Sequence, residues 1–182
     1  MKSLRESLLD DEDDVVDKLN TKTLIEYWLE KYNIKNYKIN KDNTIDAIDV
    51  YLRRYPESEL PSYIQFRNIV GSFSIYGSKL NTLKGCPKEV GVDFNCCDCK
   101  LLQTLKYAPE KVGRGFYCAG CDSLKTLEGA PKEVGRNFNC EFCKNLKSLK
   151  GITKKVYILS ISSYFDEDDA MKFCNFGRLE II

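Results

Sequence analysis

Three cysteine pairs have the spacing of a metal-binding or redox motif. Cys96-x-x-Cys99, Cys118-x-x-Cys121 and Cys140-x-x-Cys143 each place two thiols three residues apart. Paired motifs of this kind commonly supply the thiolates of a tetrahedral zinc site or an exchangeable dithiol. Three pairs do not divide into fours, however, and Ile75 and Ser78 fill the matching positions of an upstream segment. We therefore predict columns of buried free thiols, with no metal or cofactor, and keep zinc binding and redox chemistry as alternatives.

The cysteine count also bears on the cellular compartment. Nine cysteines cannot all pair within one chain, and free thiols are typical of a reducing cytoplasm. The first residues are acidic where a secretory signal needs an apolar stretch, and no apolar run is long enough to cross a membrane. The sequence therefore predicts a cytoplasmic protein without membrane contact.

The chain contains no histidine, which removes most catalytic chemistry that a 182-residue protein could perform. Serine and cysteine nucleophiles usually need a histidine base, and many zinc sites use histidine ligands. Gly113-Arg-Gly115 does not have the spacing of a phosphate-binding loop, and no carboxylate spacing singles out an acid and a base. We predict that the protein is not an enzyme.

These cysteines belong to a strict 22-residue repeat. The invariant positions are Val90, Val112 and Val134; Gly91, Gly113 and Gly135; Phe94, Phe116 and Phe138; Leu102, Leu124 and Leu146; and Pro87, Pro109 and Pro131. A unit this short cannot bury its own apolar residues, so it suits one coil of a solenoid. Within each unit, Phe-x-Cys has the two-residue period of a strand, and the glycine before it indicates a bend or a close contact between coils.

The repeat resembles a leucine-rich repeat, whose frame is L-x-x-L-x-L-x-x-N/C-x-L. Phe138-x-Cys140-x-x-Cys143 matches the central part of that frame, with one extra residue on each side. The unit LEGAPKEVG...F.C is similar to repeat proteins of large bacteriophages and gut bacteria, over roughly residues 60–156. The resemblance implies a mainly β, leucine-rich-repeat-like solenoid with minor helical content, and a scaffold role in binding.

The flanking sequence predicts the domain organisation. Residues 1–20, with five consecutive acidic residues, are predicted to form a mobile tail, and residues 21–59 an N-terminal cap. In this cap, Thr21 to Tyr32 has one apolar helical face with Thr23 as its capping residue, and Tyr37–Ile39 and Ile45–Leu52 form a strand hairpin. The solenoid spans residues 60–156. Residues 157–182 are predicted to form a C-terminal cap, in which Phe165–Ile182 covers the last strand, Val156–Ile161, with a short helix around residues 168–173.

The predicted binding surface is the concave face that solenoid strands usually form. Its outward-facing positions are Tyr76, Asn95, Tyr117, Asn139 and Glu141. Tyrosines among small polar residues suit protein recognition, because tyrosine contributes a large contact area at low entropic cost. The sequence therefore predicts a non-catalytic protein–protein interaction scaffold with an unidentified protein partner.

Basic residues supply a second hypothesis. The first sixty residues are acidic on balance, whereas the repeat region is basic, and its basic residues recur in columns. The columns contain Lys84, Lys106, Lys125, Lys147, Lys150, Arg114 and Arg136. Stacked in a solenoid, they would form a basic stripe that could bind nucleic acid, although the alternating aromatic residues typical of single-strand binding are missing. A third hypothesis, a structural part of a bacteriophage virion, rests only on the resemblance.

Overall fold

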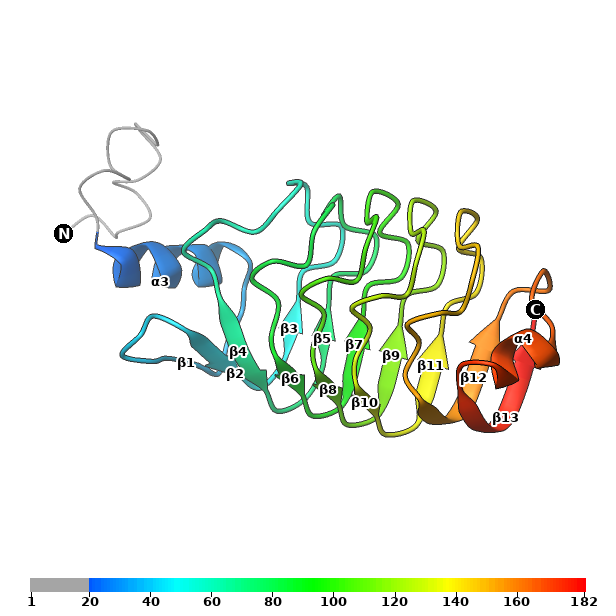
Figure 1. Cartoon of the computed structure of the whole chain (residues 1–182). Helices are drawn as coiled ribbons and strands as arrows, with labels where there is room; N and C mark the ends of the chain where they lie inside the picture. Colours follow the sequence, from blue (N-terminus) through cyan, green and yellow to red (C-terminus); the bar gives the residue numbers. More distant parts are fainter. Residues whose placement is uncertain (1–19) are drawn as a thin grey trace.

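The computed structural model describes residues 20–182, so the predicted acidic tail lies outside it except for Asn20. Over these residues the chain forms a β-solenoid of about seven turns with two helices, which confirms the predicted mainly-β solenoid. The coils follow one another along a single axis, from the helix at the N-terminal end to the last strand at the C-terminal end (Figure 1). No helix within residues 20–182 has both the length and the apolar character of a membrane span.

Each full coil contributes one short strand to each of two sheets. Sheet A has the order β1 (Tyr37–Ile39), β2 (Ile45–Ala47), β4 (Phe66–Ile69), β6 (Glu89–Val90), β8 (Lys111–Val112) and β10 (Glu133–Val134). Sheet B has the order β3 (Val50–Tyr51), β5 (Phe73–Ser74), β7 (Asp93–Asn95), β9 (Gly115–Tyr117), β11 (Asn137–Asn139), β12 (Lys155–Ile161) and β13 (Asn175–Ile181). All pairs are parallel except the β1–β2 hairpin. Parallel pairing is what a chain that always winds in one direction requires.

Residues that recur in the sequence lie above one another in the core, as predicted. Phe73, Phe94, Phe116 and Phe138 form a stack with ring centroids 5.2–5.6 Å apart, and all four rings are fully buried. In-register pairing of β5, β7, β9 and β11 produces this spacing, because adjacent strands lie about 4.8 Å apart. Each coil therefore buries its phenylalanine against its neighbours, which one unit alone could not do.

Glycine at the bend between the two strands of a coil allows the backbones to touch. A Cβ atom on Gly113 would lie 2.0 Å from the carbonyl oxygen of Gly91, and one on Gly135 would lie 2.0 Å from that of Gly113. Any side chain here would have to push two coils apart. The predicted close contact between coils is therefore the physical reason for the glycine column.

Helix α3 (Thr21–Lys31) closes the N-terminal end, and its apolar face buries Ile25, Trp28 and Leu29. The indole ring of Trp28 lies 6.3 Å from the ring of Phe66. The predicted helix is confirmed, but the prediction of Thr23 as its N-cap is wrong. Asn20 is the cap, and its side chain accepts a hydrogen bond from Thr23 N at 3.0 Å.

The predicted strand Ile45–Leu52 is two strands, β2 and β3, which belong to different sheets. The chain turns between Ala47 and Val50, so this segment already has the two-strand form of a coil. Because β2 pairs with β4 and β3 pairs with β5, the stacked coils begin before residue 60.

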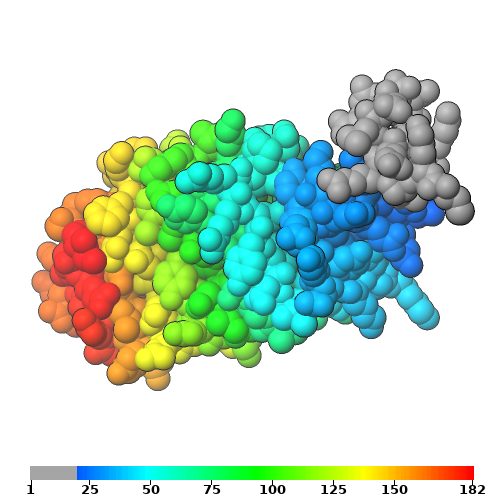
Figure 2. Space-filling view, turned by 180° about the vertical axis from the view of Figure 1, so that it is seen from behind, coloured from blue at the N-terminus to red at the C-terminus, as the bar shows by residue number. Residues whose placement is uncertain are grey.

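At the C-terminal end, the predicted strand is present as β12, and the predicted short helix as α4 (Glu167–Met171). The residues after α4 continue the sheet. They form β13, a seven-residue strand that pairs with β12 in parallel and extends sheet B. Figure 2 shows this last segment at the extreme end of the molecule, opposite the helical end.

Candidate functional site

The cysteines of the repeat lie in the core as two columns. The thiols of Cys96, Cys99, Cys118, Cys121, Cys140 and Cys143 are at most 1% exposed. The second thiol of each pair donates to a main-chain carbonyl of the preceding coil: Cys121 Sγ lies 3.1 Å from Cys96 O, and Cys143 Sγ lies 3.1 Å from Cys118 O. Upstream, Cys99 Sγ lies 3.2 Å from Ile75 O. Each such thiol satisfies a buried acceptor and joins two coils.

The pKa is raised at four of these thiols, Cys96, Cys99, Cys118 and Cys140. At Cys143, which is fully buried, a hydrogen bond with Cys118 instead lowers the pKa. Burial raises the pKa of Cys99 to about 12 and the pKa of Cys140 well above the ordinary value for a thiol. A hydrogen bond with Cys121, together with burial, raises the pKa of Cys96. The half-buried Cys97 also has a pKa of about 12, because desolvation disfavours its thiolate. Among residues 20–182, no group of three or more histidine, cysteine or acidic side chains could hold a metal ion.

The predicted contact residues do lie along sheet B, but some of their polar side-chain atoms already form hydrogen bonds within the chain. Asn95 Oδ1 accepts a hydrogen bond from Cys97 N at 2.9 Å, and Asn139 Oδ1 accepts one from Glu141 N at 3.0 Å. These local bonds fix the turn where each strand leaves the sheet. Tyr117 lies across Gly115, where an added Cβ would meet its ring at 2.4 Å.

Two positions at the end of this face differ from each other. Tyr76 is exposed, as predicted, and a hydrogen bond with Asp98 raises the pKa of its hydroxyl. The prediction that Glu141 faces solvent is wrong, because its side chain is only 7% exposed. Neighbouring coils flank it on both sides: Gly120 N donates to Glu141 O, and Ser162 Oγ accepts from the next amide, Phe142 N.

The structure divides the predicted basic stripe into separate regions. The lysines of the stripe, Lys84, Lys106, Lys125, Lys147 and Lys150, belong to the return segments that lead from one coil to the next. Arg114 and Arg136 lie instead at the glycine bends, between β8 and β9 and between β10 and β11. Lys150 Nζ is 3.9 Å from Glu128 Oε1, and Arg136 lies over the ring of Tyr157 at 6.0 Å. No single stripe contains all seven residues.

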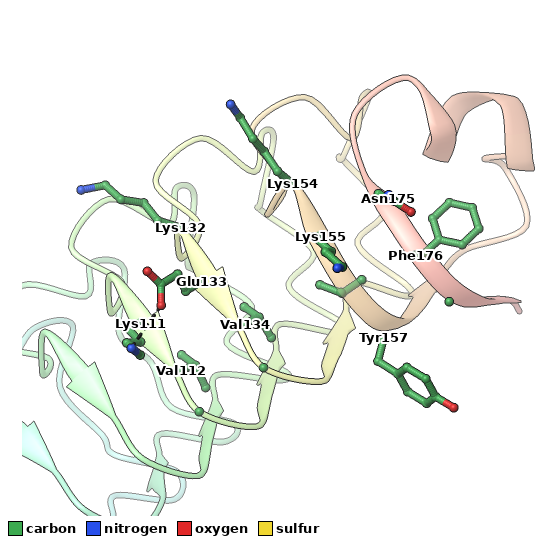
Figure 3. A pocket seen from close by; sticks show the side chains of 14 residues that line it. Lys111, Val112, Lys132, Glu133, Val134, Lys154, Lys155, Tyr157, Asn175 and Phe176 are labelled. Atoms are coloured by element: carbon green, nitrogen blue, oxygen red, sulfur yellow. Dashed lines mark ion pairs between the residues drawn. The ribbon is translucent and has the colours of Figure 1, made fainter.

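A groove lies on another surface, where sheet A stops. It has a volume of about 780 Å³, and backbone and side chains of β8, β10, β12 and β13 line it. Figure 3 shows lysine side chains around it, with Lys132 and Lys154 extending to one side and Tyr157 to the other. This surface combines a hollow with a cluster of charged side chains.

The groove opens because the hydrogen-bond ladder of sheet A is interrupted there. In the preceding coil, Lys132 N donates to Glu110 O at 2.9 Å and Gly135 N donates to Val112 O at 3.0 Å. One coil later, Tyr157 N donates to Arg136 O at 2.8 Å, two residues beyond the corresponding acceptor. Consequently β12 pairs with β11 and β13, and within residues 20–182 no strand pairing joins β10 to β12.

Two sequence changes accompany this interruption. Tyr157 occupies the position of Gly91, Gly113 and Gly135 in the 22-residue register, and Leu159 follows Val156 after three residues, whereas Phe138 follows Val134 after four. The tyrosine alone does not abolish the bend, because Val70 holds the same place in an earlier coil that keeps its two short strands, β4 and β5. With one residue fewer and no glycine, strand β12 runs continuously over seven residues. The tyrosine in the glycine column and the shorter spacing were signals that could have revealed the groove from the sequence.

The groove is positively charged. Lys111 Nζ lies 3.2 Å from Glu133 Oε2 and Lys132 Nζ lies 2.8 Å from Glu110 Oε2, so these two lysines are paired. Lys154 and Lys155, on the other wall, are exposed and have no ion-pair partner in the part of the chain that the structure describes. The site can therefore attract an anionic group without first breaking an ion pair.

Comparisons with known proteins add no identity to this geometry: no family model, curated protein or solved structure matches the chain.

Proposed function

We propose that the protein is a non-catalytic protein–protein interaction scaffold, in the manner of leucine-rich repeats, and that its groove binds an extended acidic segment of a partner protein. The observation that carries this proposal is the interrupted ladder between β10 and β12 beside two unpaired lysines. A groove with backbone edges and a positive rim suits a polypeptide in extended form, because its main chain can hydrogen-bond while its carboxylates meet the lysines.

The buried thiols support the absence of catalysis in this proposal. A cysteine nucleophile needs a lowered pKa or a neighbouring base, whereas burial raises the pKa of Cys99 and Cys97 to about 12. All nine cysteines are unpaired, which supports the proposal that the protein works in a reducing cytoplasm. A role in a bacteriophage virion remains an alternative hypothesis that no described contact addresses.

The face of sheet B, with Tyr76 and Tyr117, is a second candidate contact surface for the same function. It offers exposed aromatic area at Tyr76, but Asn95 and Asn139 have already committed their side-chain oxygens to the backbone. We therefore place the main contact in the groove and treat the sheet B face as the alternative to be tested beside it.

A charge-reversal experiment tests the groove. The double variant Lys154→Glu, Lys155→Glu is compared with Lys84→Glu, Lys106→Glu, which changes the net charge equally on the return segments. Fluorescence anisotropy with a labelled oligoglutamate peptide measures affinity. The groove variant is expected to bind at least about tenfold more weakly than the wild type, and the control no more than about twofold more weakly.

Equal losses of affinity for both double variants would mean that net charge alone attracts the peptide. That result would overturn the proposal that the groove is the binding site. The variant Tyr76→Ala, measured in the same way, tests the sheet B face and should leave peptide affinity unchanged. A DNA oligonucleotide of matched charge distinguishes the nucleic-acid hypothesis. Binding to DNA that is tighter than to the peptide and falls steeply with salt would favour that hypothesis over a protein partner.

A further inference from the structure

The free edge of β13 is the other unusual feature of the C-terminal end. Strand β12 covers one side of β13, and no strand within residues 20–182 pairs with the opposite side. At seven residues, β13 is long for an edge, and it contains no proline or lysine to discourage pairing. An edge of this kind presents a row of main-chain donors and acceptors that another strand can complete.

The apolar columns of the core end uncovered at this edge. Leu179 follows Leu159 in register, and Ile181 follows Ile161. Leu159 and Ile161 are fully buried, whereas Ile181 is 45% exposed and Leu179 is partly exposed. The same side-chain positions are therefore buried in one coil and exposed in the next, because no described strand lies beyond β13. Nearby, Met171 and Phe173 add exposed apolar surface, at 58% and 38%.

The hydrogen bonds of β13 show which residues have free main-chain groups. Ile182 N donates to Ile161 O at 3.0 Å, and Ile182 O accepts from Ser163 N at 2.7 Å, so Ile182 points its main chain toward β12. Successive residues of a strand direct these groups to opposite sides. Leu179 and Ile181 therefore direct theirs to the free edge.

We infer that a second copy of this chain occupies the edge, with the two β13 strands antiparallel about a two-fold axis at Leu179. In this register Leu179 faces Leu179 of the second copy and Ile181 faces Gly177, so the residues with free main-chain groups pair with one another. The exposed Leu179 and Ile181 side chains of both copies meet on the core side, and sheet B continues through the dimer.

Charge selects this register over its neighbours. With the axis at Leu179, Arg178 of each copy lies opposite Glu180 of the other, on the solvent face of the sheet. An axis at Arg178 would place the two Arg178 side chains opposite each other, and an axis at Glu180 would do the same for two carboxylates. Opposite charges across an antiparallel pair stabilise it and like charges destabilise it. The strand is thus complementary to itself, as a two-fold interface requires.

Sedimentation velocity of the full chain over a concentration series tests the dimer. The variants are Arg178→Glu, Glu180→Arg and the double swap of both, and Lys38→Glu on β1 is a remote control with a similar charge change. The wild type is expected to dimerise. Each single variant should raise the dimer dissociation constant about tenfold, and the double swap should return it to within about threefold of the wild type.

Three outcomes would overturn the proposal: a monomer up to millimolar concentration, a double swap that does not recover dimerisation, or an equal effect of Lys38→Glu. Because Arg178 NH2 also lies 3.0 Å from Glu180 Oε1 within one chain, thermal melts of each variant separate a loss of folding from a loss of pairing. The peptide-binding test of the groove uses different residues, so the two proposals stand or fall separately.

Discussion

The two ends of the solenoid differ in how well they cover the same core columns. At the N-terminal end, which helix α3 closes, the first members of the columns, Val50 and Leu52, are 0% and 2% exposed. At the C-terminal end, the last member Ile181 is 45% exposed at the free edge of β13. Both segments are apolar and both are ordered parts of the fold. At the N-terminal end the chain departs from the repeat and forms a helix, whereas at the C-terminal end it adds another strand to the sheet.

This difference shows what closing a solenoid requires. A helix has a wide apolar face and satisfies its own backbone, so it can lie across the end of the stack without presenting a new edge. A further strand satisfies one edge and creates another. Short edges limit this cost at the N-terminal end, where β1 has three residues and β3 has two. At the C-terminal end, β13 has seven.

Removing the side chain of Trp28, which helps to close the N-terminal end, should have the largest effect on stability. We expect Trp28→Ala to lower the free energy of unfolding by about 3–5 kcal/mol, because the buried indole packs on Phe66, Tyr55 and Tyr32. The matched change at the open end is Phe173→Ala, for which we expect a loss below about 1 kcal/mol. Chemical denaturation measures both. Equal losses would mean that the two ends are sealed to the same degree.

The glycine bends should give the next largest effect. Gly135→Ala would place a Cβ 2.0 Å from the Gly113 carbonyl oxygen, and we expect it to cost about 2–3 kcal/mol. Gly177→Ala, in the last strand, would meet the Tyr157 carbonyl oxygen at 3.1 Å and should cost less than about 1 kcal/mol. Thermal or urea unfolding of the two variants measures both losses in unfolding free energy. A tolerated Gly135→Ala would contradict the close contact between coils as the reason for the glycine column.

Periodicity made the repeating part of the fold predictable. Positions such as Phe94 and Phe116 recur at a fixed interval, so their spacing alone predicts that they stack, and the α3 helix was visible from the spacing of Ile25 and Leu29. Positions with exposed polar residues were less predictable. Glu141 is buried because of the neighbouring coils on both sides. The alternation of residues along its own strand does not predict that burial.

The groove and the open edge could not be predicted from the repeat, because both arise where the repeat fails. Where Tyr157 replaces the bend glycine and the link to the next core residue is one residue shorter, a hydrogen bond of the ladder shifts, and sheet A ends beside a hollow surface. A resemblance that extends to residue 156 stops one residue before this change. Candidate sites in a repetitive fold therefore lie where a column changes residue type.

The smallest difference between the ends should appear in local opening, and Cys174 reports it. This thiol lies between α4 and β13 and is 5% exposed, whereas Cys118 in the central coils is fully buried. Burial raises the pKa of Cys174 to about 11. At pH 8 the native thiol is therefore about a thousandth ionised and must open to react quickly. Because the open end lacks a cover, we expect iodoacetamide to modify Cys174 before Cys118, as read by mass spectrometry.

The pH dependence separates the two routes to this reaction. An opened thiol has an ordinary pKa, so its rate should level off above about pH 9, whereas reaction from the closed state would rise about tenfold per unit to about pH 11. Cys97 is the control, because it is more exposed than Cys174 but lies in a central coil and has a pKa of about 12. If Cys97 reacts first, static exposure decides the order. If Cys174 and Cys118 react at one rate, the solenoid opens only as a whole, and its two ends do not differ in stability.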